Sequence, residues 1–291
     1  MIISRLYGGL GNQMFQYALG RHLSILHNTT LKFDISFFSE KSYSKNHTPR
    51  TFDLDIFNIK NQIATDSELS LFTLNSPFSF ANKIYKSINV FRNRYILESK
   101  PIFQEDILKL PDNVYLDGYW QSDKYFSAIE SIIKNDFHLH GDIPENSQKL
   151  SDFINNTNSV AVNVRRGDFI TNPTHNVCGL EYYIRAHYLI SNKINNPSYF
   201  VFSDDIDWCK NNLNFLNPVY YVSHDFAGFK FKEYLRLMSS CKHFIIPNSS
   251  FAWWATYLAS SSCEIVISPR KWVNNELYKT MDIFRENWIC I

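Results

Sequence analysis

The sequence has no Cys-x-x-Cys pair and no spacing of Cys and His residues typical of a zinc site. Its five cysteines are scattered through 291 residues, at Cys178, Cys209, Cys241, Cys263 and Cys290. An odd, scattered set in a chain of this length indicates reduced thiols, because disulfides persist mainly in oxidising compartments. We therefore expect a cytoplasmic protein.

Long apolar segments are also lacking, since no run approaches the roughly 20 residues that span a bilayer. The first residues, Met1 to Arg5, lead directly into Gly8 and show no basic segment followed by an apolar run, as a secretory signal would. The prediction is a soluble protein with at most peripheral membrane contact. Such contact would be at the inner face of the membrane.

The net charge is close to zero, because 29 Lys and Arg residues against 28 Asp and Glu residues give +1. This balance argues against a nucleic-acid binder that works through bulk electrostatics, so a bound anion needs a local cluster of charge. With 45% hydrophobic and 20% charged residues, the chain has an ordinary globular composition. It is long enough for two domains of roughly 100–150 residues.

A glycine turn follows the first predicted strand. The apolar residues 2–6 precede Gly8-Gly9-Leu10-Gly11-Asn12-Gln13, and a helix is predicted to about His27, with Phe15, Leu19, Leu23 and Leu26 on one face. This is the layout in which backbone N–H groups meet a phosphate or a sugar. The turn does not match the dinucleotide-binding motif Gly-x-Gly-x-x-Gly, because Met14 stands in the place of the third glycine. Asn12 can cap the helix or reach a ligand, and both roles stay open.

The rest of the first half is patterned unevenly. Strands are predicted at 31–35 and 114–117, a loop at 40–50 and helical structure over 60–110. Gly118-Tyr119-Trp120-Gln121-Ser122 follows the second of these strands, and a helix with Tyr125, Phe126, Ile129 and Ile133 on its apolar face comes next. The Tyr-Trp-Gln cluster reads as exposed. It suits sugar stacking and an interdomain contact equally well.

Two adjacent arginines end the most regular strand of the chain. Val160, Val162 and Val164 alternate with less apolar residues, and Arg165-Arg166-Gly167-Asp168 follows. In open α/β sheets, ligands gather at the carboxyl ends of strands. Arginine binds phosphate oxygens through two parallel hydrogen bonds, and an aspartate can hold one guanidinium so that the other is free. The alternative is a surface strand that ends in solvated charge.

Later strands end in further polar groups. Asp204 and Asp205 follow a strand at 199–202, where carboxylates bind a ribose hydroxyl or a base N–H, or cap the helix predicted from about Ile206. Asn248-Ser249-Ser250-Phe251 opens an aromatic helix and offers hydroxyls and N–H groups to an anion. Further strands are predicted at 219–222, 243–247 and 264–268, with helices at 181–194 and 233–239. This alternation predicts a parallel, doubly wound domain.

Five blocks of this sequence together resemble the α-1,2-fucosyltransferase family, glycosyltransferase family 11. They are Gly8–Tyr17, Gly118–Ser122, Arg165–Asp168, Phe202–Asp205 and Asn248–Trp254. The blocks occur in the family's order and span nearly the whole chain, so the set is specific although no single block is. Because the chain is short and shows no membrane anchor, it is similar to the bacterial members rather than the Golgi members.

The resemblance implies an α/β, GT-B-like fold of two Rossmann-type domains with a cleft between them. Residues 1–148 would form the acceptor-side domain with the glycine loop, and residues 149–291 the domain that binds GDP-fucose. The implied reaction is inverting transfer of L-fucose to the 2-hydroxyl of a galactoside, in bacterial surface polysaccharide or lipopolysaccharide synthesis. No cofactor and no obligatory metal are expected. The acceptor would be a galactose-terminated oligosaccharide, which can be lipid-linked.

The same resemblance assigns roles to single residues. Arg165 would hold the β-phosphate and stabilise the departing GDP, helped by the helix at Ser249. Asn12 would lie beside the donor, and Arg166 would order the site through Asp168. The expected donor-binding residues are Gly9, Gly11, Asn163, Arg166, Asp204, Asp205, Ser249, Ser250 and Phe251.

One position departs from the family's motif, which usually begins with His where this chain has Asn163. Asparagine cannot take a proton at neutral pH, so a general base must lie elsewhere. Asp168 and His175, the latter in a polar loop at 171–179, are the candidates. Of the two, Asp168 is expected to be held by an arginine.

Other functions compete with this interpretation. A metal-dependent sugar transferase would use a D-x-D pair, for which Asp53 with Asp55 and Asp205 with Asp207 are the candidates. A nucleotide-sugar-binding protein without turnover would need the same pocket. An NAD-dependent enzyme is the least favoured, because the glycine fingerprint is incomplete.

Overall fold

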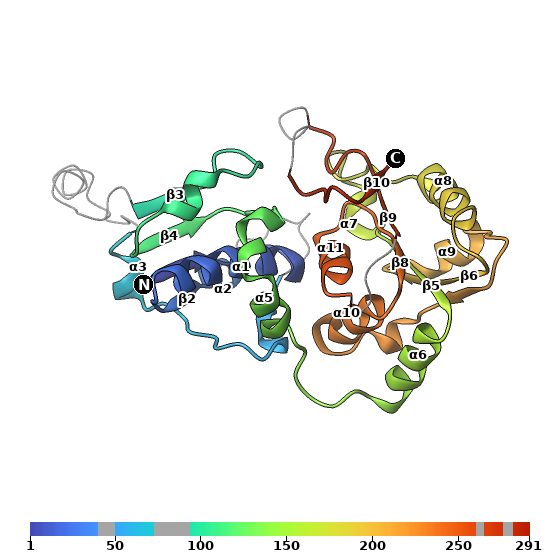
Figure 1. Ribbon diagram of the computed structural model, residues 1–291, viewed down its shortest axis with the longest axis horizontal. Coiled ribbons are helices and arrows are strands. Elements are labelled where there is room, and N and C mark those ends of the chain that lie inside the picture. The colour runs from blue at the N-terminus through green and yellow to red at the C-terminus, as the bar shows by residue number, and fades with distance from the viewer. Residues whose placement is uncertain (40–49, 73–93, 260–264, 276–281) are drawn as a thin grey trace. The chain divides into compact units, whose positions relative to one another are not determined.

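The structure is a computed structural model that describes residues 1–39, 50–72, 94–259, 265–275 and 282–291. The loop predicted at 40–50 therefore lies almost wholly outside the described residues. The chain divides into two compact units, Met1–His138 and Leu139–Ile291. Each unit is built on its own sheet and is described by itself (Figure 1).

The first unit has a parallel sheet in the order β2-β1-β4-β3. Its strands are β1 (Ile2–Arg5), β2 (Leu31–Asp34), β3 (Tyr95–Leu97) and β4 (Val114–Asp117). Its α-helices are α1 (Leu10–Leu26), α2 (Ser36–Ser39), α3 (Asp66–Leu69) and α5 (Glu130–Asp136), with short 3₁₀ turns at Leu54–Ile56, Glu105–Lys109, Asp123–Tyr125 and Ser127–Ile129.

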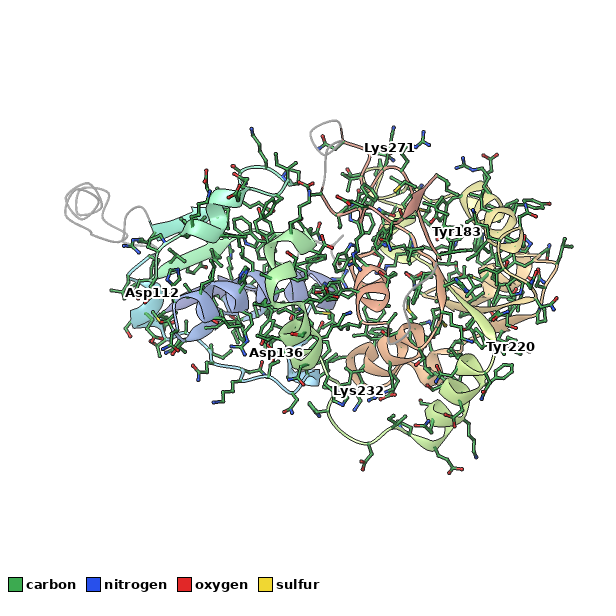
Figure 2. All side chains as sticks on the ribbon, in the orientation of Figure 1. Asp112, Asp136, Tyr183, Tyr220, Lys232 and Lys271 are labelled. Carbon is green, nitrogen blue, oxygen red and sulfur yellow. The ribbon has the colours of Figure 1, made fainter. Side chains whose placement is uncertain are left out.

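Helix α1 packs along β1 and provides much of the first core. Phe15, Leu19 and Leu23 are fully buried, as their helical spacing predicts, whereas Leu26 at the end of the helix is 54% exposed. Asp136, labelled in Figure 2, ties α5 to α1 by accepting hydrogen bonds from the hydroxyl of Tyr17 at 2.8 Å and from Nε of Arg21 at 2.9 Å.

The prediction of helical structure over 60–110 is wrong at β3, which pairs in parallel with β4. A three-residue strand at the edge of a sheet is too short to show an alternating pattern, which is why the sequence does not reveal it. The helix expected after Ser122 is instead two 3₁₀ turns followed by α5. Its apolar residues Tyr125, Phe126, Ile129 and Ile133 are nevertheless buried.

The second unit has a parallel sheet in the order β10-β9-β8-β5-β6-β7. Its strands are β5 (Asn158–Val164), β6 (Pro197–Ser203), β7 (Val219–Tyr221), β8 (His243–Ile245), β9 (Ile265–Ser268) and β10 (Ile289–Cys290). Its α-helices are α6 (Glu145–Asn155), α7 (Gly167–Ile170), α8 (Leu180–Ser191), α9 (Ile206–Asn212), α10 (Lys232–Ser239) and α11 (Ser250–Tyr257).

Helices cover both faces of this sheet, which confirms the predicted doubly wound arrangement. The valines of β5 pack with α8 and α9 in a core that includes Tyr183, labelled in Figure 2. On the opposite face, Phe200 contacts Phe153 of α6, and Phe202 contacts Tyr234 of α10. Helix α6, within which the boundary expected after residue 148 falls, packs on β5 and α10.

Each sheet has a switch point, where successive strands are added on opposite sides of the first strand. It lies between β1 and β4 in the first unit and between β5 and β8 in the second. In open α/β sheets, the loops at the carboxyl ends of the strands beside such a point form the ligand site. Those loops carry the glycine turn and Gly118–Ser122 in one unit. In the other they carry Arg165–Asp168 and Asn248–Phe251.

Two further findings bear on the expected compartment and membrane contact. Cys178, Cys209, Cys241 and Cys290 are free thiols, and Cys263 lies outside the described residues. Within the parts of the chain that the structure describes, no helix combines the length and apolar character needed to cross a bilayer.

Candidate active site

Arg165 follows β5 directly and is held by two carboxylates. Its Nη2 lies 2.7 Å from Oδ1 of Asp168, and its Nη1 lies 2.9 Å from Oδ2 of Asp204. Asp204 reaches it because β5 and β6 pair in register up to Val164 and Ser203. The Arg165 side chain remains 29% exposed, and a guanidinium has five N–H donors. Arg165 is therefore fixed in direction and keeps donors for a ligand.

Arg166 is fixed by a different carboxylate. Its backbone N–H donates to Oδ1 of Asp204 at 2.8 Å, and its Nε donates to Oδ2 of Asp205 at 3.1 Å. Its guanidinium also lies 3.8 Å from the centre of the Trp208 ring. Asp168, three residues after Arg165 in the short helix α7, pairs with Arg165. The expected action of Arg166 through Asp168 stays a prediction.

Asp204 and Asp205 were expected to bind guanine or ribose, and both already have protein partners. Asp205 caps α9 by accepting from the backbone N–H of Trp208 at 3.1 Å, which agrees with the capping alternative. Asp204 holds both arginines, and a Cβ at Gly167 would lie 2.8 Å from its Oδ2. Gly167 therefore leaves the space into which this carboxylate fits.

The formal charges of this cluster do not favour an anion by themselves. Two guanidinium groups and three carboxylates sum to −1. The first turn of α11 adds positive potential, because the first N–H groups of a helix have no intrahelical acceptor. Oγ of Ser249 accepts from the N–H of Ala252 at 3.4 Å, which makes Ser249 the cap. The N–H groups of Ser250 and Phe251 are the ones this helix can offer to a diphosphate.

His175 packs beside the arginine cluster through Phe169. The two rings stack at 5.2 Å, and Cζ of Arg165 lies 5.5 Å from the Phe169 centroid. Burial lowers the pKa of His175 below its ordinary value, while the charge of Asp168 acts in the opposite direction. The imidazole is therefore neutral at neutral pH.

Asn248 opens the Asn248-Ser249-Ser250-Phe251 block, but it was assigned no role of its own from the sequence. It is buried, and its Nδ2 donates to the carbonyl oxygens of His175 at 3.0 Å and Trp272 at 2.8 Å. It therefore joins the loop of His175 to the start of α11. The signal that could have found it is a side-chain amide one residue before the Ser249 cap.

Asn163, which replaces the family's usual histidine, lies on β5 and donates from Nδ2 to the carbonyl oxygen of Phe202 at 3.2 Å. This contact joins β5 to β6 just below the two arginines. In the structure this contact is structural, and the donor-binding role expected of Asn163 stays a prediction.

At the switch point of the first sheet, Asn12 does not cap α1. The N-cap is Gly9, which has extended backbone angles and no side chain, and Gly11 is buried within the first turn. Oδ1 of Asn12 instead accepts from Nε2 of Gln121 at 2.9 Å. Gly8 has φ +77°, and a Cβ on it would lie 2.6 Å from Nδ2 of Asn12. The glycine turn therefore makes room for the Asn12 amide.

The turn that carries Gln121 is held by Glu98, which the sequence did not indicate. Its carboxylate accepts from the backbone N–H groups of Tyr119 at 2.7 Å and Trp120 at 3.0 Å. Burial raises the pKa of Glu98, an effect that these two hydrogen bonds oppose. Trp120 has φ +56° and is fully buried, so the expectation of an exposed Tyr-Trp-Gln cluster is wrong for this residue. Tyr119 is 41% exposed.

The two D-x-D pairs have separate structural roles. The hydroxyl of Thr51 donates to Asp53 at 2.6 Å, and the N–H of Asp53 donates to Oε1 of Gln13 at 2.8 Å. Asp205 is the α9 cap, whereas Asp207 is 92% exposed beside Lys210. Among the described residues, no three or more His, Cys, Asp or Glu side chains lie together as potential metal ligands.

The chain has two parallel α/β units, and at the switch point of the second unit neighbouring strands lead to the two arginines and to the N-terminus of α11. This is the arrangement of a GT-B-like glycosyltransferase. The family is shown by the sequence as a whole. A family model described as "Glycosyl transferase family 11" matches residues 2–291, and the chain belongs to this family.

Similar proteins agree with this assignment. The chain is 35% identical to an alpha-1,2-colitosyltransferase of Escherichia coli, over 100% of this chain and 99% of the relative. It is 32% identical to the Escherichia coli O-antigen biosynthesis glycosyltransferase WbnK, over 98% and 99%. Among solved structures, NodZ alpha-1,6-fucosyltransferase soaked with GDP-fucose has a TM-score of 0.53 at 15% identity, covering 92% of this chain and 94% of that one. This last likeness concerns the fold and confirms the GT-B-like prediction.

Proposed function

We propose that this glycosyltransferase moves L-fucose from GDP-fucose to the 2-hydroxyl of a galactoside and forms an α-1,2 linkage with inversion. The observation that carries the proposal is Arg165, fixed by two carboxylates at the switch point of the second sheet. The family and the α-1,2 linkage named for the 35% identical relative support it. The name of WbnK supports a place in bacterial O-antigen synthesis.

Departure of GDP is the step that Arg165 would assist. Negative charge builds on the β-phosphate as the bond to the sugar breaks, and preorganised donors stabilise such charge most strongly. Arg165 is preorganised because Asp168 and Asp204 fix its direction. The N–H groups of Ser250 and Phe251 would add to this stabilisation at the same strand edge. Arg166 would contribute charge, with its own direction set by Asp205.

Asp204 and Asp205 would act mainly by holding the arginines, since both carboxylates already have protein partners. A contact with ribose or guanine would have to use a free lone pair of either group. Gly9 and Gly11 would shape the turn in front of α1, and Asn163 would support the strand edge beneath the arginines.

The acceptor hydroxyl would need little activation in this mechanism. Asp168 is already paired with Arg165 at 2.7 Å, so we do not assign it as the general base. His175 is neutral at neutral pH and remains the side chain able to take the proton. Early departure of GDP leaves an oxocarbenium-like centre that a neutral hydroxyl can attack, so we assign His175 a supporting role.

Transfer of colitose is the second candidate, because the 35% identical relative is named a colitosyltransferase. Colitose is L-fucose without its 3-hydroxyl group. An enzyme that hydrogen-bonds this hydroxyl rejects the deoxy sugar strongly, whereas an apolar contact at the same place separates the two sugars only weakly. The ratio of the rates with GDP-fucose and GDP-colitose therefore shows which of these two contacts the enzyme makes.

We assign donor binding to the second unit and the acceptor to the first. The acceptor would be a galactose-terminated oligosaccharide, in a lipid-linked form if the reaction belongs to O-antigen assembly. Contact with a membrane would then be peripheral, at its cytoplasmic face. No metal would be required, because guanidinium and helix N–H groups supply the positive charge that a metal would bring.

The test is turnover of GDP-fucose and of GDP-colitose with a panel of galactosides, followed by NMR assignment of the product linkage. We expect an α-1,2-linked product with one of the two donors. Binding of GDP-sugar without any product would favour a nucleotide-sugar-binding protein. Turnover that requires Mn²⁺ would favour the metal-dependent alternative.

A further inference from the structure

The hydrogen bond between Gln121 and Asn12 sets the direction of the Asn12 amide. Nε2 of Gln121 is the donor and Oδ1 of Asn12 is the acceptor, at 2.9 Å. Both residues follow neighbouring strands, β1 and β4, at the switch point of the first sheet. An asparagine amide has an acceptor end and a donor end. With its oxygen turned to Gln121, Asn12 presents its NH₂ group elsewhere.

The other side of the amide is limited by the glycine turn. A Cβ on Gly8 would lie 2.6 Å from Nδ2 and 3.3 Å from Cβ of Asn12, so the side chain fits closely over this glycine. Gly8 also has φ +77°, which other residues rarely adopt. Asn12 is therefore confined between Gly8 and Gln121.

Gln121 is itself held firmly in place. It follows Trp120, whose N–H and that of Tyr119 donate to the Glu98 carboxylate. Gly118 permits this close approach, because a Cβ there would lie 2.3 Å from Cβ of Glu98. The N–H of Ser122 closes the turn onto the carbonyl oxygen of Trp120 at 2.8 Å.

We propose that Gln121 is a positioning residue that makes Asn12 a hydrogen-bond donor toward the substrate. The substrate atom that contacts Asn12 is then a hydrogen-bond acceptor: a phosphate oxygen, a sugar ring oxygen or the oxygen of a hydroxyl group. In this orientation the oxygen of Asn12 is turned to Gln121, so the group that Asn12 directs to the substrate is its NH₂ donor. This inference rests on the proposed function, in which Asn12 touches the substrate.

Three substitutions test the direction of the amide. Gln121→Glu keeps the shape of the side chain but replaces its donor by an acceptor, so Asn12 must turn its NH₂ group inward and its oxygen toward the substrate. Gln121→Met removes the hydrogen bond and leaves Asn12 free to adopt either orientation. Asn12→Ala removes the donor altogether.

We expect kcat to fall by about 10²–10³-fold in Asn12→Ala and nearly as far in Gln121→Glu, as for the loss of one preorganised donor. Gln121→Met should lose about tenfold, because part of the population keeps the active orientation. A role in packing alone predicts a different order, in which the isosteric Glu variant is at least as active as Met. That order would overturn the proposal.

Repulsion by the new carboxylate must be separated from reorientation of Asn12. Simple repulsion of an anionic donor raises its KM and weakens with added salt, since exposed charges are screened. Reorientation lowers kcat, and salt does not restore it. A Gln121→Glu defect confined to a salt-sensitive KM would contradict the proposal.

A second measurement needs no substrate and no turnover. In ligand-free protein labelled with ¹⁵N in its Asn and Gln side chains, the NH₂ protons of Gln121 should exchange slowly and those of Asn12 rapidly. Protection of the Asn12 NH₂ group instead would refute the assigned orientation. If the parent transfers no sugar while Gln121 shows the expected protection, the proposed function has failed and the orientation of Asn12 stands.

Discussion

The switch points of the two sheets differ in the chemistry of the residues they hold. At the first, Asn12 and Gln121 form a neutral amide pair at 2.9 Å. At the second, Arg165 and Arg166 are set among three carboxylates, with ion-pair distances of 2.7 to 3.1 Å. Asn12, Gln121, Arg165 and Arg166 are all partly buried, so the degree of burial does not explain the difference.

This difference supports the proposed assignment of the diphosphate to the second switch point and of the sugar to the first. Guanidinium groups suit a diphosphate, whose charge they neutralise, whereas neutral amides suit the hydroxyl and ether oxygens of sugars. The side chains at the two switch points are also held in place by different interactions. Carboxylates fix the arginines by charge, while the glycine turn and Gln121 fix Asn12 by shape and a single hydrogen bond.

The largest effect should follow loss of charge at the second switch point. Arg165→Ala should lower transfer by about 10³-fold or more, because a preorganised charge on the leaving group is removed. Arg165→Lys should restore little, since a point charge does not reproduce the guanidinium fork. Arg185→Ala, at an exposed position on α8, is the matched control. Activity of Arg165→Ala within about threefold of the parent would remove Arg165 from the mechanism.

A smaller, local effect is expected at the first switch point. Gly118→Ser introduces a Cβ that would lie 2.3 Å from Cβ of Glu98 and should cost about 1–3 kcal/mol of stability, the range for overpacking. Gly179→Ser is the matched control, because no atom lies within 4 Å of a Cβ there. Thermal unfolding of both variants checks this. Equal melting temperatures would show that the turn around Glu98 adapts freely.

Substitution of His175 should have a modest effect. Burial lowers its pKa, so the imidazole is neutral at pH 7 and takes up a proton only below its ordinary value of about 6.5. We expect His175→Ala and His175→Gln to stay within about tenfold of the parent, with a flat pH profile above that value. A steep fall of the parent's rate on the acid side, absent from both variants, would instead identify a general base.

Removal of metal should have the smallest effect of all. Activity in excess EDTA should match that of untreated enzyme, because arginine and helix N–H groups provide the charge stabilisation. The measurement is the initial rate with and without chelator. Complete loss that Mn²⁺ restores would contradict this account of the second switch point.

The sequence predicted the strands that matter and the motifs at their ends. Long buried strands such as β5 and β6 show a clear apolar pattern, and a parallel sheet necessarily brings their carboxyl ends to one edge. This geometry brings Arg165 and Asp204 together at that edge, although Asp204 was expected from the sequence to bind guanine or ribose. The short strand β3 escaped prediction because three residues cannot establish a period.

Side-chain pairing was less accessible to prediction. Asp168 pairs with Arg165, three residues earlier in the chain, and the sequence alone does not say which of two adjacent arginines it contacts. Trp120 is fully buried and has a positive φ, a backbone conformation that its residue type does not suggest. Glu98 reaches the turn of Gln121 through the pairing of β3 with β4, which the sequence did not show.

The most direct test of the division between the two switch points is calorimetric titration of GDP into the Arg165→Ala and Asn12→Ala variants. Arg165→Ala should weaken GDP binding by about 10- to 100-fold, the loss expected for a charged hydrogen bond. Asn12→Ala should bind GDP within about threefold of the parent, although it transfers sugar poorly. Unchanged GDP affinity in Arg165→Ala would contradict the assignment of the diphosphate to the second sheet.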